Sequence, residues 1–169
     1  MLLVRAETTE DQAAVRRVNE LAFEGAAEAD LVDALRGSGA AHVSLVAEEG
    51  GRVVGHILFS PVVVESAGAD WEAVGLGPMA VVPEQQGRGV GSALVREGLR
   101  ECRRRGREVV FVLGHAEYYP RFGFRTAGPL GVTCEFPAPE EFFMVAELTP
   151  GALAGRAGLV RYRPEFRNP

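Results

Sequence analysis

Cysteine and histidine are scarce in the sequence, and the few present stand apart from one another. The two cysteines, Cys102 and Cys134, fit neither a disulfide framework nor a metal-ligand motif. The three histidines, His42, His56 and His115, each stand alone. The pattern predicts no metal site.

Long hydrophobic runs are also missing. The longest apolar stretch, residues 73–82, contains two glycines and a proline. It falls far short of the roughly 18 residues that a membrane-spanning helix needs. The N-terminal stretch reaches charge at Arg5 and Glu7 without the apolar segment of a signal peptide. We therefore expect a cytoplasmic protein with no membrane partner.

A surplus of positive charge is absent as well. The formal net charge is −5, so binding to nucleic acid is not expected. Basic residues gather at 103–105, where they complement the C-terminal end of a predicted helix. The chain has 169 residues, of which 47% are apolar, and shows no repeat or linker. It is long enough to bury a real core and is predicted to form one domain, residues 1–169.

Hydrophobic periodicity and turn residues predict a mixture of strands and helices. Strands are expected at 2–6, 42–49, 51–66, 71–82, 108–114, 124–127, 142–148 and 159–164, and helices at 8–23, 27–36 and 90–105. The stretch EEGGR is expected to form the turn of a hairpin between the second and third strands. Strand runs with helices between them indicate an α+β class with a mixed sheet.

The stretch QQGRGVGSAL, residues 85–94, lies between a predicted strand and a predicted helix. Amides at a helix N-terminus favour an anion, and glycines let a phosphate approach without a Cβ in the way. A Walker A loop is excluded because the stretch has no lysine. A dinucleotide fingerprint is disfavoured because Ser92 or Leu94 stands where its third glycine should be. Glycines that only turn a strand into a helix remain an alternative.

Two motifs together resemble those of the GNAT N-acetyltransferase superfamily. Within MAVVPEQQGRGVGSAL, Gln86, Gly89 and Gly91 stand at the positions of the family's pyrophosphate-binding loop. Downstream, VLGHAEYYPRFGF contains Tyr119 and Gly123 at the positions of a second family motif. This second stretch is similar to a bacterial branch that reads V-L-G-x-x-x-Y-Y-x-R-F-G-F.

The resemblance implies a fold for the whole chain. The family is a three-layer α/β fold with a mixed, mostly antiparallel twisted sheet of about seven strands and helices on both faces. The predicted elements follow the same order up to about Leu148. The remainder would be a C-terminal extension of the same domain.

The resemblance also implies a co-substrate, acetyl-CoA, and the residues that hold it. By similarity the pyrophosphate of coenzyme A would meet the backbone amides of Arg88, Gly89, Val90, Gly91 and Ser92. Gln86 and Gly87 would begin the loop. The pantetheine arm would lie along the backbone of Met79, Ala80 and Val81.

The implied reaction is attack by a neutral amine on a thioester, which needs a base for the amine and a donor for the leaving thiolate. Tyr119 stands at the family's general-acid position, with Tyr118 as the fallback and the one expected to pack beneath the sheet. Histone-acetylating relatives carry a glutamate as base where this chain has Gly75. The base is left open among water, Glu72 and His115.

The acceptor is not identified by the sequence beyond a primary amine of a small molecule or a protein. Glu24, Glu28 and Asp30 lie in or near the first helices, where they would suit a cationic acceptor or form a solvated helix face. The last strands could supply another wall. A non-catalytic acyl-CoA-binding module of the same fold is the alternative function, and the resemblance allows a homodimer.

Overall fold

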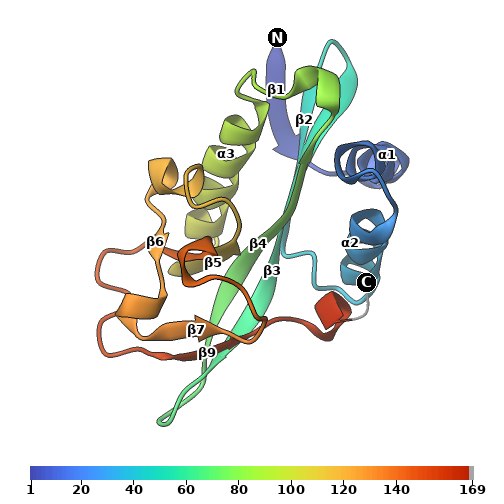
Figure 1. Cartoon of the computed structure of the whole chain (residues 1–169). Coiled ribbons are helices and arrows are strands. Elements are labelled where there is room, and N and C mark those ends of the chain that lie inside the picture. Colours follow the sequence, from blue (N-terminus) through green and yellow to red (C-terminus); the bar gives the residue numbers. More distant parts are fainter. Residues whose placement is uncertain (168–169) are drawn as a thin grey trace. The chain divides into compact units, whose positions relative to one another are not determined.

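Two long strands, β3 (Arg52–Glu65) and β4 (Trp71–Val81), run through both units of a computed structural model that describes residues 1–167. The first unit holds Met1–Ser60, Gly77–Glu101 and the segment from Pro164. The second holds Pro61–Leu76 and Cys102–Arg163. Figure 1 traces the chain through them. The last two residues of the predicted domain 1–169 lie outside the described residues, and the prediction of a single domain stays a prediction.

The strands of the first unit pair in the order of the sequence. β1 (Leu2–Ala6) is antiparallel to β2 (Val43–Glu49), and β2 is antiparallel to β3 in the register Leu45↔Ile57. The predicted hairpin is confirmed, since Gly50 and Gly51 connect β2 to β3 with φ angles of 58° and 79°. Such angles favour glycine, which explains the choice of residue in this turn.

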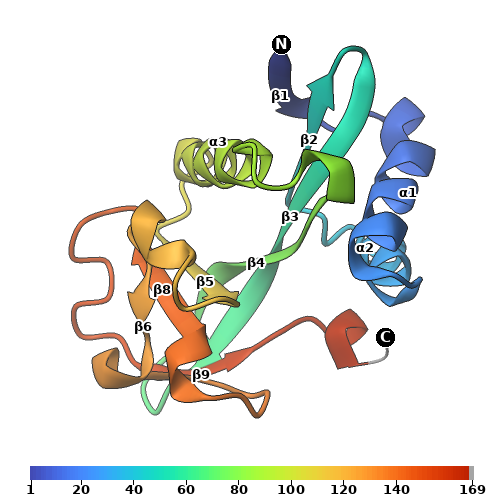
Figure 2. The ribbon, with the colours of Figure 1, turned by 45° about the horizontal axis from the view of Figure 1, so that its top comes forward.

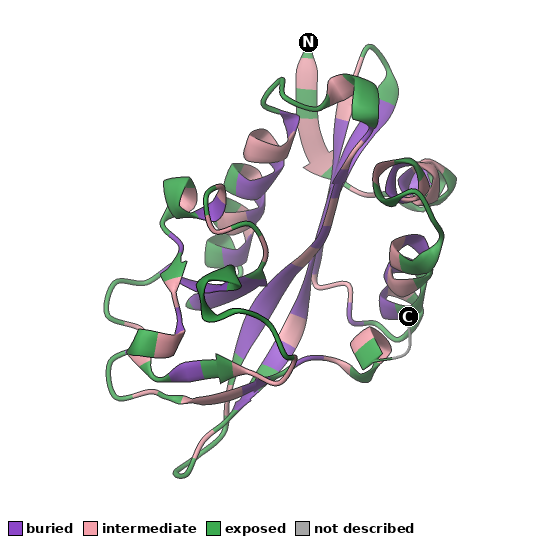
Figure 3. Ribbon diagram, in the orientation of Figure 1, coloured by how far each residue is buried: buried purple, intermediate pink, exposed green. Residues whose placement is uncertain are grey.

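Helices cover both faces of β3 in the first unit. α1 (Gln12–Phe23) and α2 (Ala27–Gly37) lie on one side of the β2–β3 ribbon, and α3 (Val90–Arg104) lies on the other (Figure 2). Alternate residues of β3 meet the two layers, because successive side chains in a strand point to opposite faces. A Cβ on Gly55 would touch Val90 and Leu94 of α3, whereas His56 contacts α1. β3 is therefore buried on both faces over most of its length (Figure 3).

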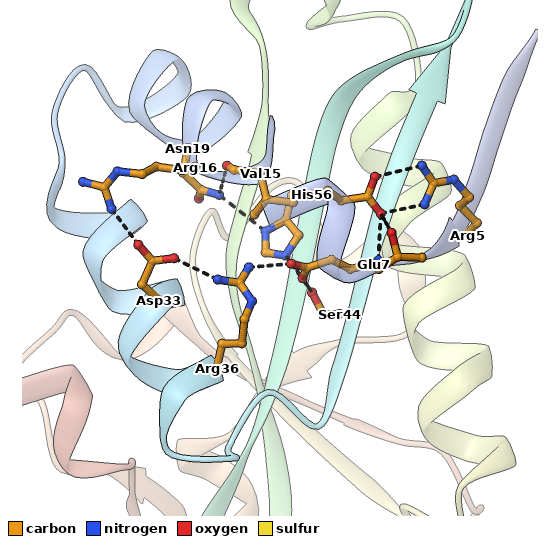
Figure 4. A network of polar contacts seen from close by, with 11 residues as sticks. Arg5, Glu7, Val15, Arg16, Asn19, Asp33, Arg36, Ser44 and His56 are labelled. Carbon is orange, nitrogen blue, oxygen red and sulfur yellow. Dashed lines mark hydrogen bonds and ion pairs between the residues drawn. The ribbon is translucent and has the colours of Figure 1, made fainter. Parts of the chain in front are cut away.

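A buried polar network joins the face of β3 that carries His56 to both helices on that side (Figure 4). The His56 side chain is 0% exposed, its Nε2 lies 2.8 Å from Ser44 Oγ, and its Nδ1 lies 3.4 Å from Asn19 Nδ2. Ser44 donates to Glu7, which also accepts from Arg36 at 2.5 Å. Since Ser44 has one proton and gives it to Glu7, His56 must donate through Nε2 and accept at Nδ1.

The pKa values of His56 and Glu7 are both lowered, which keeps the imidazole neutral and the carboxylate charged in this network. Burial lowers the pKa of His56, so its imidazole is held neutral. Burial would raise the pKa of Glu7, but hydrogen bonding and the nearby charges outweigh it and bring the pKa to about 2. Every basic residue in the chain outside the histidines is arginine, since the sequence contains no lysine. Arginine suits these sites because its planar fork binds carboxylates through two donors, as Arg5 does at Asp11.

The second unit is built around β5 (Val109–Leu113). β5 is parallel to β4 in the register Gly75↔Phe111 and antiparallel to β8 (Phe143–Glu147). Three further strands complete the unit: β6 (Arg125–Thr126) pairs with β8, β9 (Gly158–Arg161) pairs with β3, and β7 (Val132–Cys134) pairs with β9. β5 is buried from Val109 to Val112, as its apolar sequence predicts.

The predicted class is confirmed: the fold is mixed α/β, with a mostly antiparallel open sheet and three α-helices among residues 1–167. Trp71 and Glu72 lie within β4, in agreement with the strand predicted at 71–82. α1 starts at Gln12 because Thr8 and Asp11 form a capping box around a preceding 3-10 turn. Within the described part of the chain, no helix is both long and apolar enough to cross a membrane.

The buried imidazole makes a prediction about acid stability. The folded pKa of His56 lies below its ordinary value of 6.5, so its contribution to stability is present above that pH and is lost as the pH falls toward the folded pKa. The free energy of unfolding should therefore fall below pH 6.5 by up to about 1.4 kcal/mol per pH unit from this group. His56→Gln should flatten that slope in urea titrations at pH 7 and pH 5, whereas His115→Gln, at an exposed site, should not. An unchanged slope in His56→Gln would contradict the assignment.

The contact between α3 and β3 makes a second prediction. A Cβ at Gly98 would overlap the Phe59 ring, so Gly98→Ala should destabilise the fold by about 1–3 kcal/mol, despite the better helix propensity of alanine. Phe59→Leu in the Gly98→Ala background should recover part of the loss. Gly37→Ala is the control, because its Cβ would meet nothing within 4 Å, and its melting temperature should not fall. Equal behaviour of the two alanine variants would exclude the close approach.

Candidate active site

The glycine-rich stretch forms an exposed loop between β4 and α3, in the first unit. After a 3-10 turn at Pro83–Gln85, the chain passes through four exposed residues, Gln86 to Gly89, before the helix begins at Val90. Gly87 and Gly89 have φ angles of 75° and 86°, and a Cβ on either would meet nothing within 4 Å. These two positions need glycine for backbone conformation, and they leave the surface beside them open.

The loop ends at the N-terminus of a four-turn helix. The first intrahelical hydrogen bond runs from the Ala93 amide to the Gly89 carbonyl at 3.0 Å. The amides of Val90 and Gly91 precede that bond and point out of the helix end. Aligned peptide dipoles give this end a partial positive charge, which favours an anion.

The Gln86 side chain connects the start of the loop to the end of β4 by a hydrogen bond. Its Nε2 donates to the carbonyl of Val81, the last residue of β4, at 2.9 Å. Met79 and Val81 are half-buried, and Ala80 is buried. The ladder between β4 and β5 ends earlier, at Leu76↔Val112, and the cis peptide bond Gly77–Pro78 follows it directly.

Tyr119 lies in the second unit, in a 3-10 turn at Tyr119–Phe122 after β5. Its ring packs against the backbone of Gly114, where a Cβ would stand 2.6 Å from a ring carbon. Tyr118 and Phe124 contact the ring edge-on, at centroid distances of 5.1 and 5.6 Å. Only 7% of Tyr119 is exposed, and burial raises its pKa to about 12, so the phenol stays protonated at neutral pH.

The expectation that Tyr118 is the buried one of the two tyrosines is wrong. Tyr118 is half-buried and carries the Arg121 guanidinium over its ring at 4.6 Å. The 3-10 turn rotates the two neighbours to different sides, and Gly114 makes room for Tyr119 alone. The sequence could not distinguish them because the deciding contact is with the backbone.

Gly75 stands where histone-acetylating relatives carry a glutamate, and the space beside it is occupied by side chains of the second unit. A Cβ on Gly75 would stand 2.9 Å from the Tyr162 ring and 3.2 Å from Val62. A carboxylate side chain at residue 75 therefore has no room. Tyr162 is 87 positions away along the sequence, so no local pattern could have predicted this contact.

The two other candidate bases lie at opposite ends of β5. In the β4–β5 register Glu72 is level with Glu108, and it forms an exposed ion pair with Arg107 at 3.7 Å. Five residues of strand, about 16 Å at 3.3 Å per residue, separate that level from Leu113. His115 is exposed directly after β5, on the Tyr119 side. The geometry favours His115 or water over Glu72.

Two hollows beside this end of β5 were not found from the sequence. One has a volume of about 280 Å³ and is lined by Leu113, Gly114, His115, Ala138 and Phe142. The other, of about 220 Å³, shares Ala138 and is lined by residues including Cys134, Phe136, Glu140 and Phe143. The adjacent phenylalanines of FFMVAEL were the available signal, but both could have been core residues.

The predicted contacts to coenzyme A lie in one unit of the chain, and the predicted general acid lies in the other. The predicted coenzyme A contacts, residues 79–81 and 86–92, all belong to the first unit, and Tyr119 belongs to the second. Asp30, considered for the acceptor, is paired with Arg16 at 2.9 Å. Among residues 1–167 no group of three or more His, Cys, Asp or Glu side chains could hold a metal ion.

Comparison with known proteins gives consistent matches. Residues 4–127 match the model of an acetyltransferase (GNAT) domain. The chain is 42% identical over 153 residues to YjhQ, an uncharacterised N-acetyltransferase of Escherichia coli (strain K12), covering 86% of this chain and 84% of that one.

Two solved structures are similar over nearly the whole chain. The crystal structure of the GNAT family N-acetyltransferase YhbS from Escherichia coli, in complex with CoA, has a TM-score of 0.92 and 38% identity, covering 98% of this chain and 92% of that one. A GNAT family acetyltransferase from Brucella melitensis, in complex with acetyl-CoA, has a TM-score of 0.80 and 38% identity, covering 98% of each chain. With its glycine loop at a helix N-terminus and these matches over most of its length, the chain belongs to the GNAT acetyltransferase family.

Proposed function

We propose that the protein transfers the acetyl group of acetyl-CoA to a primary amine of a small molecule or a protein. The observation that carries the proposal is the exposed loop of residues 86–89, which leads into the N-terminus of α3. The YhbS and Brucella structures, which contain CoA and acetyl-CoA, support the choice of co-substrate. Release of free thiol from acetyl-CoA on addition of an amine is the direct test.

The loop fits a pyrophosphate by shape and by charge. Gly87 and Gly89 keep side chains out of the space above the loop, and the amides of the first turn of α3 supply donors. Arg88 lies exposed between the two glycines and adds a full positive charge. Gly91 and Ser92 continue the same turn. Met79, Ala80 and Val81 follow the last β4–β5 pair, so their backbone would suit the pantetheine arm.

Bound acetyl-CoA supplies the thioester carbon that the amine attacks: the C–N bond forms, the C–S bond breaks, and the amine loses a proton. Tyr119 would act as the general acid at the sulfur. A thiol has an ordinary pKa of about 8.5, so complete proton transfer from a phenol with a pKa of about 12 runs uphill. Tyr119 therefore works best by a hydrogen bond that strengthens as charge develops on sulfur.

Direct attack is favoured over an acetylated-cysteine intermediate. Cys134 lines a hollow in the second unit, but burial raises the pKa of its thiol. A nucleophilic cysteine needs a lowered pKa, because the thiolate is the reactive form. Cys102 is fully buried in α3. The amine proton would pass to water or to His115, which lies exposed at the end of β5.

The first prediction concerns the loop. Gly89→Val should weaken the binding of acetyl-CoA by about tenfold or more, because its Cβ would stand in the open space beside the amides. Valine is also strained at a positive φ, so Gly39→Val is the control: its φ is 77°, a Cβ there would also meet nothing within 4 Å, and it lies between α2 and β2. Calorimetry should show weak binding only in Gly89→Val. Equal affinities in the two variants would remove the loop from the site.

The second prediction concerns the acid. Tyr119→Phe should lower kcat by about 10²–10⁴, the range for loss of a general acid, while the Kd of acetyl-CoA changes little. Since the pKa of Tyr119 is raised to about 12, the wild-type rate should show no alkaline decline from this group below about pH 10. Tyr118→Phe should keep near-normal kcat. If Tyr118→Phe loses the activity and Tyr119→Phe keeps it, the acid is Tyr118.

Binding without turnover would identify the alternative. A non-catalytic acyl-CoA-binding module would bind acetyl-CoA in calorimetry and release no thiol with any amine. The Gly75–Tyr162 contact leaves no place for a strand glutamate, which is compatible with either function. Assembly as a homodimer and location in the cytoplasm stay predictions.

A further inference from the structure

The hollow next to Tyr119 has the character of a binding site for an apolar group. Leu113 and Phe142 line it, and they are 39% and 38% exposed although both are large and apolar. Single exposed apolar side chains are normal on a protein surface, but an adjacent pair on the wall of a hollow makes that hollow a candidate site for an apolar group. The Gly114 amide donates to the Phe142 carbonyl at 2.9 Å, which holds the two walls together.

The hollow is connected to the proposed chemistry through Gly114. Gly114 lines the hollow, and the Tyr119 ring packs against the same residue, where a Cβ would stand 2.6 Å from a ring carbon. A group held in the hollow would therefore lie beside the proposed acid. His115 lines the same hollow, so a proton acceptor is also present.

The charges around the hollow argue against a highly cationic occupant. His115 is the one ionisable side chain among the residues that line it. The neighbouring hollow adds aromatic walls at Phe136 and Phe143, a Cys134 thiol that burial keeps protonated, and a single carboxylate, Glu140. A polyamine or an aminoglycoside would need several carboxylates to replace its lost solvation.

The size of the hollow also limits the occupant. A volume of about 280 Å³ is at the small end of ligand sites, which suits a fragment-sized group better than a folded surface. Resting on the proposed acetyltransferase function, we propose that the acceptor is a primary amine carried on a compact aromatic or alkyl body, and that this body lies against Leu113 and Phe142. Its amine would then point toward Tyr119 and His115.

The test compares 2-phenylethylamine with ethylamine and spermidine in the thiol-release assay. The phenyl compound should have a kcat/KM at least about tenfold above that of ethylamine, because its ring is removed from water in the hollow. Phe142→Ala should reduce the preference to less than about threefold, and Phe142→Leu should keep most of it. Phe23→Ala is the matched control, since Phe23 is also a 40% exposed phenylalanine but lies on α1.

A binding measurement keeps this inference separate from the proposed function. 2-Phenylethylamine should bind calorimetrically to the protein saturated with coenzyme A, and Phe142→Ala, but not Phe23→Ala, should weaken that binding about tenfold or more. Binding without thiol release would overturn the acetyltransferase function and leave the apolar site standing. Thiol release with no preference for the phenyl compound, absence of binding, or displacement of coenzyme A by the amine would overturn the apolar acceptor site.

Discussion

The first unit depends on keeping one imidazole neutral in a fully buried position. His56 can remain there because Asn19 of α1 and Ser44 of β2 form hydrogen bonds with its two nitrogens. Ser44 in turn donates to Glu7, which also accepts from Arg36 of α2. Each partner comes from a different element, so the hydrogen bonds are complete only when both helices lie correctly on the sheet. The two imidazole nitrogens are both satisfied, although the buried Asn19 Oδ1 beside them has no hydrogen-bond partner in the part of the chain that the structure describes. The fold and the charge state of His56 therefore support each other.

On the opposite face of β3, small residues fix the position of the N-terminal end of α3, the proposed anion site. Gly55 admits Val90 and Leu94, from the first turns of α3, and Gly98 admits the Phe59 ring. The helix start is thus fixed by packing, while residues 86–89 of the loop stay exposed. A helix start fixed by packing beneath an open loop would present several amides to the proposed phosphate without further ordering on binding.

Local patterns in the sequence predicted much of this structure. The hairpin, the long helix after the loop, and the apolar β5 follow from turn chemistry and periodicity, which act over a few residues. The glycine loop was also recognisable, because its conformation depends on its own residues. The His56 partners, the Tyr162 ring over Gly75 and the exposed pair Leu113 and Phe142 were not, since each is created by segments distant in sequence. The sequence also could not show which of Tyr118 and Tyr119 is buried, because that depends on a contact with the backbone of Gly114.

The exclusive use of arginine has a consequence for a protein of this family. Arginine holds the ion pairs of the first unit, from Arg5 with Asp11 to Arg36 with Glu7, and no lysine occurs among the 169 residues. A guanidinium stays protonated under all ordinary conditions and offers no neutral amine to a thioester. The side chains of the chain are therefore inert toward Nε-acetylation, by its own activity or by acetyl-CoA in solution. The ion pairs that hold α1 and α2 in place keep their charge in a medium rich in acetyl donors.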